Sequence, residues 1–174
     1  NDMTQQQVYE RVNVYDGFEV RRYAPCVVAE VLMAGSFERA GNAGFGPLVS
    51  YISGRNQTGG KVAMTAPVIQ EQIADSDLHR VQFVMPAGSS MSSLPAPATQ
   101  GLRLMELPEQ TAAVMRYSGR WSEAAYRQHV AELTERVQRA GLRVVGSARL
   151  ARFDPPWKPG FLRRNEVVLP VEPA

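Results

Sequence analysis

Cysteine is almost absent from this sequence, and long apolar runs are absent altogether. Cys26 is the single cysteine among 174 residues, which excludes a disulfide within the chain and is compatible with a reducing compartment. No stretch approaches the roughly 18 consecutive apolar residues that a spanning helix needs, and no charged segment followed by an apolar one marks a signal peptide. We therefore expect a soluble, cytoplasmic chain without a membrane partner, or a periplasmic or exported one if a signal peptide has been removed. Met3, followed by the polar stretch TQQQ, is typical of a native start, with Asn1 and Asp2 as extra residues.

An excess of charge of one sign is also lacking. The 19 Lys and Arg residues nearly balance the 17 Asp and Glu residues, which leaves a net charge of +2. No basic run is longer than the pairs Arg21-Arg22 and Arg163-Arg164, which is too little for a groove that follows a nucleic-acid backbone. With 44% hydrophobic residues the chain can bury a core, and its length fits one domain, residues 1–174. We expect a monomer that does not bind nucleic acid.

Motifs for metal binding and catalysis are missing as well. The two histidines, His79 and His129, form no HxxxH pattern, and there is no CxxC or carboxylate cluster at metal-ligand spacing. The sequence places neither histidine near Cys26, and no acid–base pair can be nominated. We therefore predict a protein without enzymatic activity and name no metal ligand. Cys26 is interpreted as a small buried hydrophobe, His79 as a solvated turn residue, and His129 as a residue at the border of a helix's apolar stripe.

Short alternating segments predict a chain that is rich in β-strands. The expected strands are residues 18–23, 27–33, 61–68, 81–86, 102–107, 112–119, 142–150 and 166–171. One helix is clear, because Ser122 suits its N-cap and Gly141 suits its C-terminal stop. Its apolar positions, at three- and four-residue spacing, are Tyr126, Val130, Leu133 and Val137.

The chain contains two copies of one pattern, offset by 84 residues. Phe18 falls on Leu102, Phe37 falls on Trp121, and the stretch 84–86 falls on 168–170. The two copies predict a β-β-α-β-β unit used twice, over residues 18–86 and 102–170. The alignment also predicts a helix in ERAGNAGFGPLVSYISG, with a frayed or kinked first half because of its glycines and proline. An antiparallel sheet with two helices, of the α+β class, follows from this unit.

The two copies differ most at strand ends and loops, where binding groups tend to lie. MTAPV (64–68) aligns with ARLAR (148–152), and QEQIADSDLHRV (70–81) aligns with DPPWKPGFLRRN (154–165). The second loop combines three prolines with aromatic and basic residues, so it holds those groups at low entropic cost. Together with the glycine-rich stretch YISGRNQTGGK (51–61), it suits a flat apolar ligand with acidic arms. The alternative for the loop is a rigid cap on one end of the sheet.

Five stretches, taken in order and spacing, resemble the SOUL haem-binding protein family. They are FEVRRY (18–23), PLVSYISGRNQTGGKVAMTAPV (47–68), FVMP (83–86), YSGRW (117–121) and DPPWKPGFLRRNEVVLPV (154–171). The resemblance runs from about Tyr9 to Val171. It implies a distorted antiparallel β-barrel or curved sheet built from a duplicated β-β-α-β-β unit with two flanking helices, similar to the effector-binding domains of the GyrI type.

For function, the resemblance implies reversible, non-enzymatic binding of haem or another tetrapyrrole, as a carrier or buffer. The implied apolar cleft uses Leu48, Ile52 and Met64, together with Trp157 and Phe161. The implied partners of the propionates are Arg55, Lys61, Lys158, Arg163 and Arg164. The chain has no histidine before position 79, where one branch of the family has a proposed axial ligand, so the iron ligand is unknown.

Two other functions remain open at the level of the sequence. One is a hydrolytic or haem-modifying enzyme, or another small-molecule binder, in a GyrI-like cleft, which rests on architecture alone. The other is a protein-interaction module that uses the edge of a helix. Lys61 itself has the alternative interpretation of an ordinary solvated lysine.

Overall fold

The computed structural model describes residues 4–174, which fold as two compact units. The first unit holds the described residues up to Gln7 together with Pro25–Pro108. The second unit holds Val8–Ala24 and Glu109–Ala174. The start predicted at Met3 lies outside the described residues. Within residues 4–174, no helix is both long enough and apolar enough to cross a membrane.

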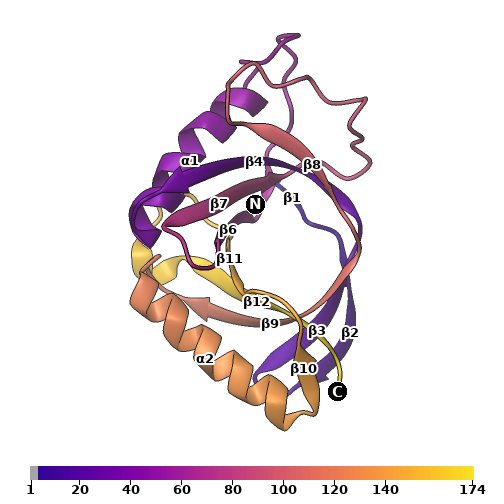
Figure 1. Cartoon of the computed structure of the whole chain (residues 1–174), viewed down its shortest axis with the longest axis vertical. Coiled ribbons are helices and arrows are strands. Elements are labelled where there is room, and N and C mark those ends of the chain that lie inside the picture. The colour runs from indigo at the N-terminus through magenta and orange to yellow at the C-terminus, as the bar shows by residue number, and fades with distance from the viewer. Residues whose placement is uncertain (1–3) are drawn as a thin grey trace. The chain divides into compact units, whose positions relative to one another are not determined.

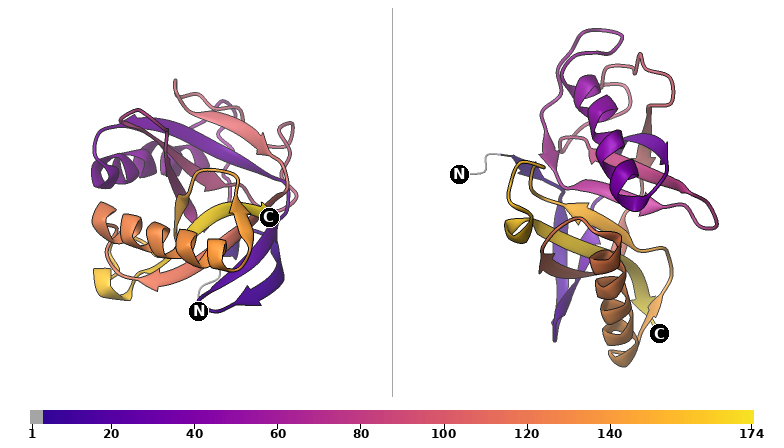
Figure 2. Two further views of the ribbon diagram at one scale, coloured as in Figure 1. Left: turned by 60° about the horizontal axis from the view of Figure 1, so that its bottom comes forward. Right: turned by 90° about the vertical axis from the view of Figure 1, so that its left-hand side faces the viewer.

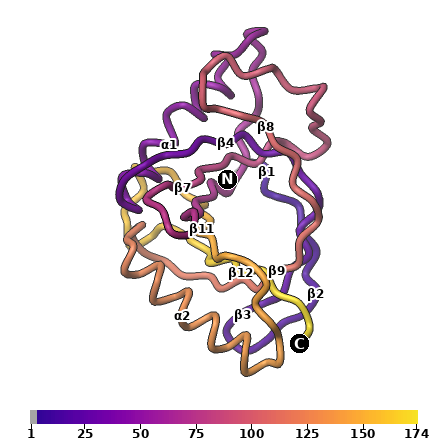
Figure 3. The backbone as a smooth tube through the Cα atoms, viewed as in Figure 1, coloured from indigo at the N-terminus to yellow at the C-terminus, as the bar shows by residue number. Residues whose placement is uncertain are grey.

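The first unit is an antiparallel sheet with one helix (Figure 1). Its elements are β1 (Gln5–Gln6), β4 (Cys26–Ala34), α1 (Phe37–Ile52), β5 (Thr65–Ala66), β6 (Val68–Gln72), β7 (Leu78–Val84) and β8 (Arg103–Leu107). The sheet has the order β6-β7-β4-β8, while β1 and β5 form a short parallel pair. The backbone tube in Figure 3 shows β8 beside β4, although a long segment of chain separates them in sequence.

The second unit is also an antiparallel sheet with one helix, and its sheet has two more strands. Its elements are β2 (Tyr9–Tyr15), β3 (Phe18–Tyr23), β9 (Gln110–Ser118), α2 (Glu123–Arg139), β10 (Leu142–Val144), β11 (Arg149–Arg152), the 3-10 turn η1 (Gly160–Leu162) and β12 (Arg164–Pro173). The strand order is β2-β3-β9-β12-β11, and β10 also pairs with β12. Figure 2 shows α2, the orange helix, running along the strands of its own unit, where it packs on β9, β10 and β12. The predicted fold class, α+β with an antiparallel sheet and two helices, is confirmed.

Helix α1 forms despite its glycines because it is capped and packed. The Ser36 hydroxyl accepts a hydrogen bond from the backbone N–H of Arg39, which satisfies one donor of the first turn. Leu48, Tyr51 and Ile52 enter a core that also contains Val81 of β7. The helix is continuous from Phe37 to Ile52 with Pro47 inside it. A frayed first half, one of the two predicted alternatives, is therefore wrong, since capping and burial outweigh the low propensity of glycine. The alternative of a kinked first half stays a prediction.

Helix α2 begins and ends close to where the sequence predicted. The Ser122 hydroxyl accepts from the backbone N–H of Ala125, and the helix ends before Ala140 and Gly141. Leu133 and Val137 are its fully buried residues, each at 0% exposure. The predicted cap and apolar stripe are thus confirmed, because both depend on local spacing alone.

The predicted strand over residues 61–68 is wrong in its first half. Only Thr65–Ala66 and Val68–Gln72 form strands, and residues 61–64 belong to the loop that follows α1. Val62 donates from its backbone N–H to the carbonyl of Ile52, the last residue of α1. Backbone bonding to the helix end replaces bonding to a neighbouring strand, so the apolar alternation in KVAM does not produce a strand.

The boundaries of the two compact units differ from the boundaries of the two predicted repeats. Strand β3 opens the first predicted repeat but lies in the second unit, where it pairs with β9. Strand β8 opens the second predicted repeat but lies in the first unit, where it pairs with β4. The repeat over 18–86 and 102–170 remains a prediction about the sequence.

Candidate functional site

The loop that follows α1 is organised around one asparagine. The Asn56 amide nitrogen donates to the carbonyls of Tyr51 at 3.0 Å and Gly60 at 2.7 Å. Its amide oxygen accepts from the backbone N–H groups of Thr58 at 3.2 Å and Gly59 at 2.9 Å. The side chain therefore substitutes for regular backbone pairing and closes the glycine-rich stretch into one conformation.

Two predicted propionate partners, Arg55 and Lys61, lie on this ordered loop. Both side chains are exposed. Within residues 4–174, neither cation has a carboxylate within 4 Å. The nearby Met64 is 37% exposed, whereas Leu48 and Ile52 are buried at 0% and 7%. The loop thus presents two cations and a thioether over a buried apolar core.

The other five predicted residues lie in the second unit, four on the loop between β11 and β12 and Arg164 as the first residue of β12. Trp157 and Phe161 are 84% and 74% exposed. Lys158 forms an ion pair with Asp154 at 2.9 Å, and Arg164 forms one with the fully buried Glu166 at 3.2 Å. These two cations are already compensated, so they are weaker candidates for a propionate than the cations of the first unit.

Arg163 supports the loop from within. Its Nε donates to the carbonyl of Lys158 at 2.9 Å, and one terminal nitrogen donates to the carbonyl of Pro156 at 2.5 Å. The guanidinium also lies 4.2 Å from the centre of the Trp121 ring, in cation–π geometry. The prediction that Arg163 meets a propionate is untested, but its contacts show a role in holding the loop.

The ten predicted residues are therefore divided evenly between the two units. Leu48, Ile52, Arg55, Lys61 and Met64 belong to the first unit, and Trp157, Lys158, Phe161, Arg163 and Arg164 belong to the second. That all ten line one cleft remains a prediction. The α1 loop is the part of the predicted site whose cations are exposed and not engaged in ion pairs within residues 4–174.

Each unit buries one glutamate that the sequence analysis did not single out. Glu30 on β4 is at 0% exposure and is contacted by Arg80 at 3.1 Å and Arg103 at 2.8 Å. Gln82 also donates to Glu30, at 2.8 Å. A carboxylate inside the apolar run VVAEVL is a signal that would have predicted a buried ionic group, because an isolated charge is too costly to bury.

Glu166 on β12 is the corresponding group of the second unit, also at 0% exposure. Arg21 holds it through two parallel hydrogen bonds, at 2.7 Å and 2.9 Å, and donates to the Tyr23 hydroxyl at 3.1 Å. Burial alone lowers the pKa of Arg21, but the hydrogen bonds and charge of Glu166 outweigh burial and raise it. The centre of the Tyr9 ring lies 4.1 Å from the Arg21 guanidinium. Arg21 is therefore charged and structural.

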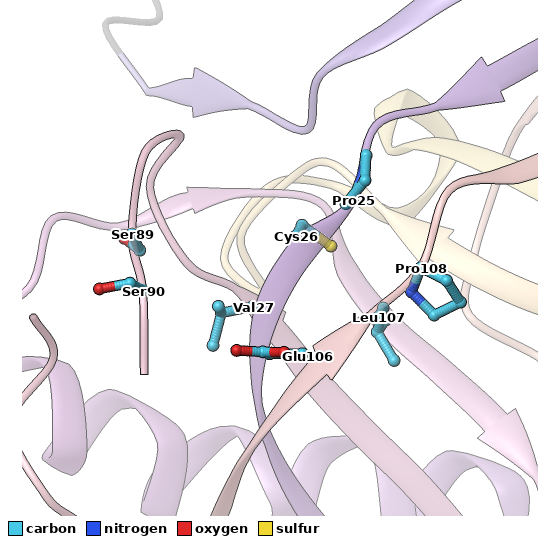
Figure 4. A pocket seen from close by; sticks show the side chains of 8 residues that line it. All are labelled: Pro25, Cys26, Val27, Ser89, Ser90, Glu106, Leu107 and Pro108. Carbon is cyan, nitrogen blue, oxygen red and sulfur yellow. The ribbon is translucent and has the colours of Figure 1, made fainter. Parts of the chain in front are cut away.

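A pocket of about 440 Å³ opens in the first unit beside the start of β4 (Figure 4). Figure 4 shows Cys26 on β4, Leu107 and Pro108 at the end of β8, and Ser89 and Ser90 on the loop that leads to β8. Cys26 is half-buried and lines this pocket, which corrects its interpretation as a buried hydrophobe. None of the eight lining residues is cationic. The pocket therefore does not match the haem site that the sequence predicted.

The two histidines occupy different environments. His79 is 3% exposed, and its ring nitrogens contact the Gln70 amide at 3.4 Å and the Gly35 carbonyl at 3.2 Å. The predicted solvated His79 is therefore wrong, because the turn that precedes it brings the ring under the start of α1. His129 is half-buried and stacks on Tyr117, with ring centres 3.9 Å apart. Its predicted place at the border of the apolar stripe is confirmed. Within residues 4–174, no three His, Cys, Asp or Glu side chains are grouped to hold a metal ion.

Two buried tyrosines test whether a buried hydroxyl stabilises the fold only when it has a hydrogen-bond partner. The Tyr51 hydroxyl donates to the Pro95 carbonyl at 2.6 Å, whereas the Tyr117 hydroxyl has no hydrogen-bond partner among residues 4–174. We expect Tyr51→Phe to lower the free energy of unfolding by about 1 kcal/mol, and Tyr117→Phe to raise it by about 1 kcal/mol, because only the second change removes an unsatisfied polar group. Urea unfolding of the two variants measures both effects.

The pH dependence of unfolding gives a second measurement on Tyr117. Burial raises the pKa of Tyr117 to about 12 from its ordinary value of 10.0, against a smaller opposing effect of the Arg152 charge. The unfolded chain loses the Tyr117 proton near pH 10, whereas the folded chain keeps it until about pH 12. The free energy of unfolding therefore falls as the pH rises from about 10 to about 12. Tyr117→Phe should show a shallower fall over this range. An unchanged alkaline profile, or a loss of stability at neutral pH, would contradict the assignment.

Comparison with solved structures places this α+β arrangement in a known fold. The C-terminal domain of EcmrR is 14% identical, with a TM-score of 0.67, over 96% of this chain and 99% of that one. A hydrolase from Listeria innocua is 18% identical, with a TM-score of 0.61, over 98% and 94%. SAV2435, solved bound to tetraphenylphosphonium, is 13% identical, with a TM-score of 0.53, over 89% and 93%. At these identities the likeness shows the fold alone.

The family is shown by the sequence comparison. The model of the SOUL heme-binding protein family matches residues 4–170, which is nearly the whole chain. The chain therefore belongs to the SOUL heme-binding protein family, as the resemblance of its motifs predicted. None of the curated proteins matches the chain.

Proposed function

We propose that this protein reversibly binds haem or another tetrapyrrole and does not transform it. The observation that carries the proposal is the exposed pair Arg55 and Lys61 on the Asn56-organised loop of a SOUL family chain. A tetrapyrrole such as haem combines a flat apolar ring with acidic side chains. Cations without a competing carboxylate can pair with those acids, while burial of the ring supplies affinity at roughly 25 cal/mol per Å².

The buried carboxylates support an anionic rather than a cationic ligand. SAV2435 was solved with a lipophilic cation bound. In this chain, the fully buried Glu30 and Glu166 are each paired with arginine already. A cationic ligand would have to displace a guanidinium to reach either of them, which costs several kcal/mol for a buried pair.

Hemin titration tests the proposal directly. We expect a shifted Soret band at micromolar protein, and we expect tetraphenylphosphonium not to compete. Replacing both Arg55 and Lys61 with alanine should weaken hemin binding about tenfold, since each cation contributes a charge-assisted hydrogen bond. The same variant should bind the dimethyl ester of the porphyrin as tightly as the unchanged protein does, because the ester has no carboxylate.

The matched control is Arg39→Ala, which removes an exposed cation from α1 of the same unit. Hemin affinity should not change in this variant. An unaltered Soret band for the unchanged protein would refute tetrapyrrole binding, whereas equal losses in the control and the double variant would refute the assigned loop. Formation of biliverdin or release of iron with a reductant would show an enzyme instead.

A further inference from the structure

The loop between β11 and β12 carries an exposed apolar tip. We name Trp157, Phe161 and Leu162 the aromatic tip; their exposed fractions are 84%, 74% and 52%. Three large apolar side chains this exposed within residues 157–162 are uncommon on a soluble surface. Each aromatic side chain offers about 150–250 Å² when fully exposed, so the tip presents about 400 Å² of apolar surface.

The tip is held in place, although its side chains face solvent. Asp154 accepts from the Lys158 ammonium at 2.9 Å and from the Arg164 backbone N–H at 2.5 Å. Arg163 donates to two carbonyls of the loop, and η1 forms between Gly160 and Leu162. Burial acts to raise the pKa of Asp154, but the hydrogen bonds from Arg164 and Lys158 outweigh it and lower that pKa. The loop is thus ordered without needing the tip to pack on anything.

The loop that carries the tip also has more cations than carboxylates near it. Residues 153–164 contain three cations. Lys158 is paired with Asp154 and Arg164 with Glu166, whereas Arg163 is not in an ion pair within residues 4–174. The exposed Arg120 adds a further cation, because its Cγ lies against Gly160, where an added Cβ would stand at 2.6 Å. Arg163 and Arg120 have no carboxylate within 4 Å among residues 4–174, so they leave this loop and its surroundings with an excess of positive charge.

We propose that the aromatic tip inserts into the surface of an anionic phospholipid bilayer. A stable protein–protein interface buries about 800 Å² on each partner, roughly twice what the tip offers. Interfacial insertion needs only a small apolar wedge, which Trp and Phe suit, together with cations that meet anionic headgroups. This inference goes beyond tetrapyrrole binding and does not rest on it. It departs from the expectation of no membrane partner, which rested on the lack of a spanning segment, because peripheral insertion requires none.

Flotation with vesicles tests the inference on the full chain without haem. We expect the protein to float with vesicles of phosphatidylglycerol and phosphatidylcholine, and to remain in solution with phosphatidylcholine alone. Trp157→Ala combined with Phe161→Ala should lower the partition coefficient about tenfold or more. Raising the salt from about 0.1 M to about 1 M should weaken binding of the unchanged protein, because the Debye length falls to about 3 Å.

The matched control is Val14→Ala, which trims a 63% exposed side chain on β2 of the same unit. It should float like the unchanged protein. The inference is overturned if the unchanged protein fails to float, or if the double variant floats equally well. It is also overturned if the protein dimerises instead of binding vesicles and the double variant abolishes that dimerisation. Hemin titration is carried out without lipid, and flotation is carried out without haem. Failure of flotation therefore contradicts membrane insertion alone, and an unchanged Soret band contradicts tetrapyrrole binding alone. Because both replaced side chains are exposed, we expect the double variant to fold. An unfolding temperature equal to that of the unchanged protein would show this.

Discussion

Replacing Arg21 with alanine is expected to lower the free energy of unfolding by about 3–5 kcal/mol. The change leaves Glu166, at 0% exposure, without the two hydrogen bonds that Arg21 supplies. Removing one partner of a buried ion pair leaves a charge that neither water nor the remaining neighbours compensate fully. Arg164, at 3.2 Å from one Glu166 oxygen, compensates only in part. Urea unfolding followed by circular dichroism measures the loss.

The neighbouring Arg22 provides the control. It pairs with Glu10 at 3.0 Å, but its side chain is 41% exposed and that of Glu10 is 72% exposed. Exposed pairs contribute about 0–1 kcal/mol, so Arg22→Ala should change stability by less than about 1 kcal/mol. Arg21→Met combined with Glu166→Leu should recover much of the loss, because it removes both charges together. Equal losses at Arg21 and Arg22 would show that burial of this pair does not matter.

Gly44→Ala is expected to destabilise the protein by about 1–3 kcal/mol, although alanine is the better helix former. A Cβ at position 44 would stand 2.7 Å from the Cβ of Val81 and 2.8 Å from one of its methyl groups. The Val81 Cβ is fixed to the backbone of β7, so it cannot move away without shifting the strand. Helix α1 can therefore lie close to β7 only because position 44 has no side chain.

Gly46→Ala is the control within the same helix. A Cβ there has nothing within 4 Å beyond its own chain neighbours, so the propensity gain of up to about 1 kcal/mol remains. The following Pro47 reduces that gain, because proline disfavours the helical conformation of the residue before it. We expect Gly46→Ala to raise the free energy of unfolding by between about 0 and 1 kcal/mol, as measured by thermal or urea unfolding. A larger loss at Gly46 than at Gly44 would contradict the packing argument.

The parts of the fold that the sequence predicted well are those with local causes. Helix α2 starts at a capping serine and carries its apolar residues at helical spacing, and both signals lie within its own segment. Strand β3 matches residues 18–23, as predicted. The hairpin strand β2 was missed because its seven residues are mostly exposed, so it lacks the alternation of a half-buried strand.

The candidate site was predictable only as a list of residue types. The sequence shows cations at residues 55–61 and 158–164, and only the structure shows which of them are paired. Lys158 and Arg164 form ion pairs with carboxylates, whereas Arg55 and Lys61 form none within residues 4–174. Whether a cation is available to a ligand depends on neighbours that periodicity does not reveal. The burial of His79 has the same origin, since its partners come from the start of α1.

By itself, the sequence determined the family, the α+β class, the capped second helix and the two loops that carry the unusual residues, because motifs, caps and periodicity are properties of short segments. Only the tertiary structure decided that β3 pairs with β9 and β8 with β4, and that Arg21 meets Glu166, 145 residues away. Those pairings depend on burying apolar faces and satisfying buried charges across the chain. The free energy of a buried ion pair is set by which groups leave water together, and that is a property of the folded molecule.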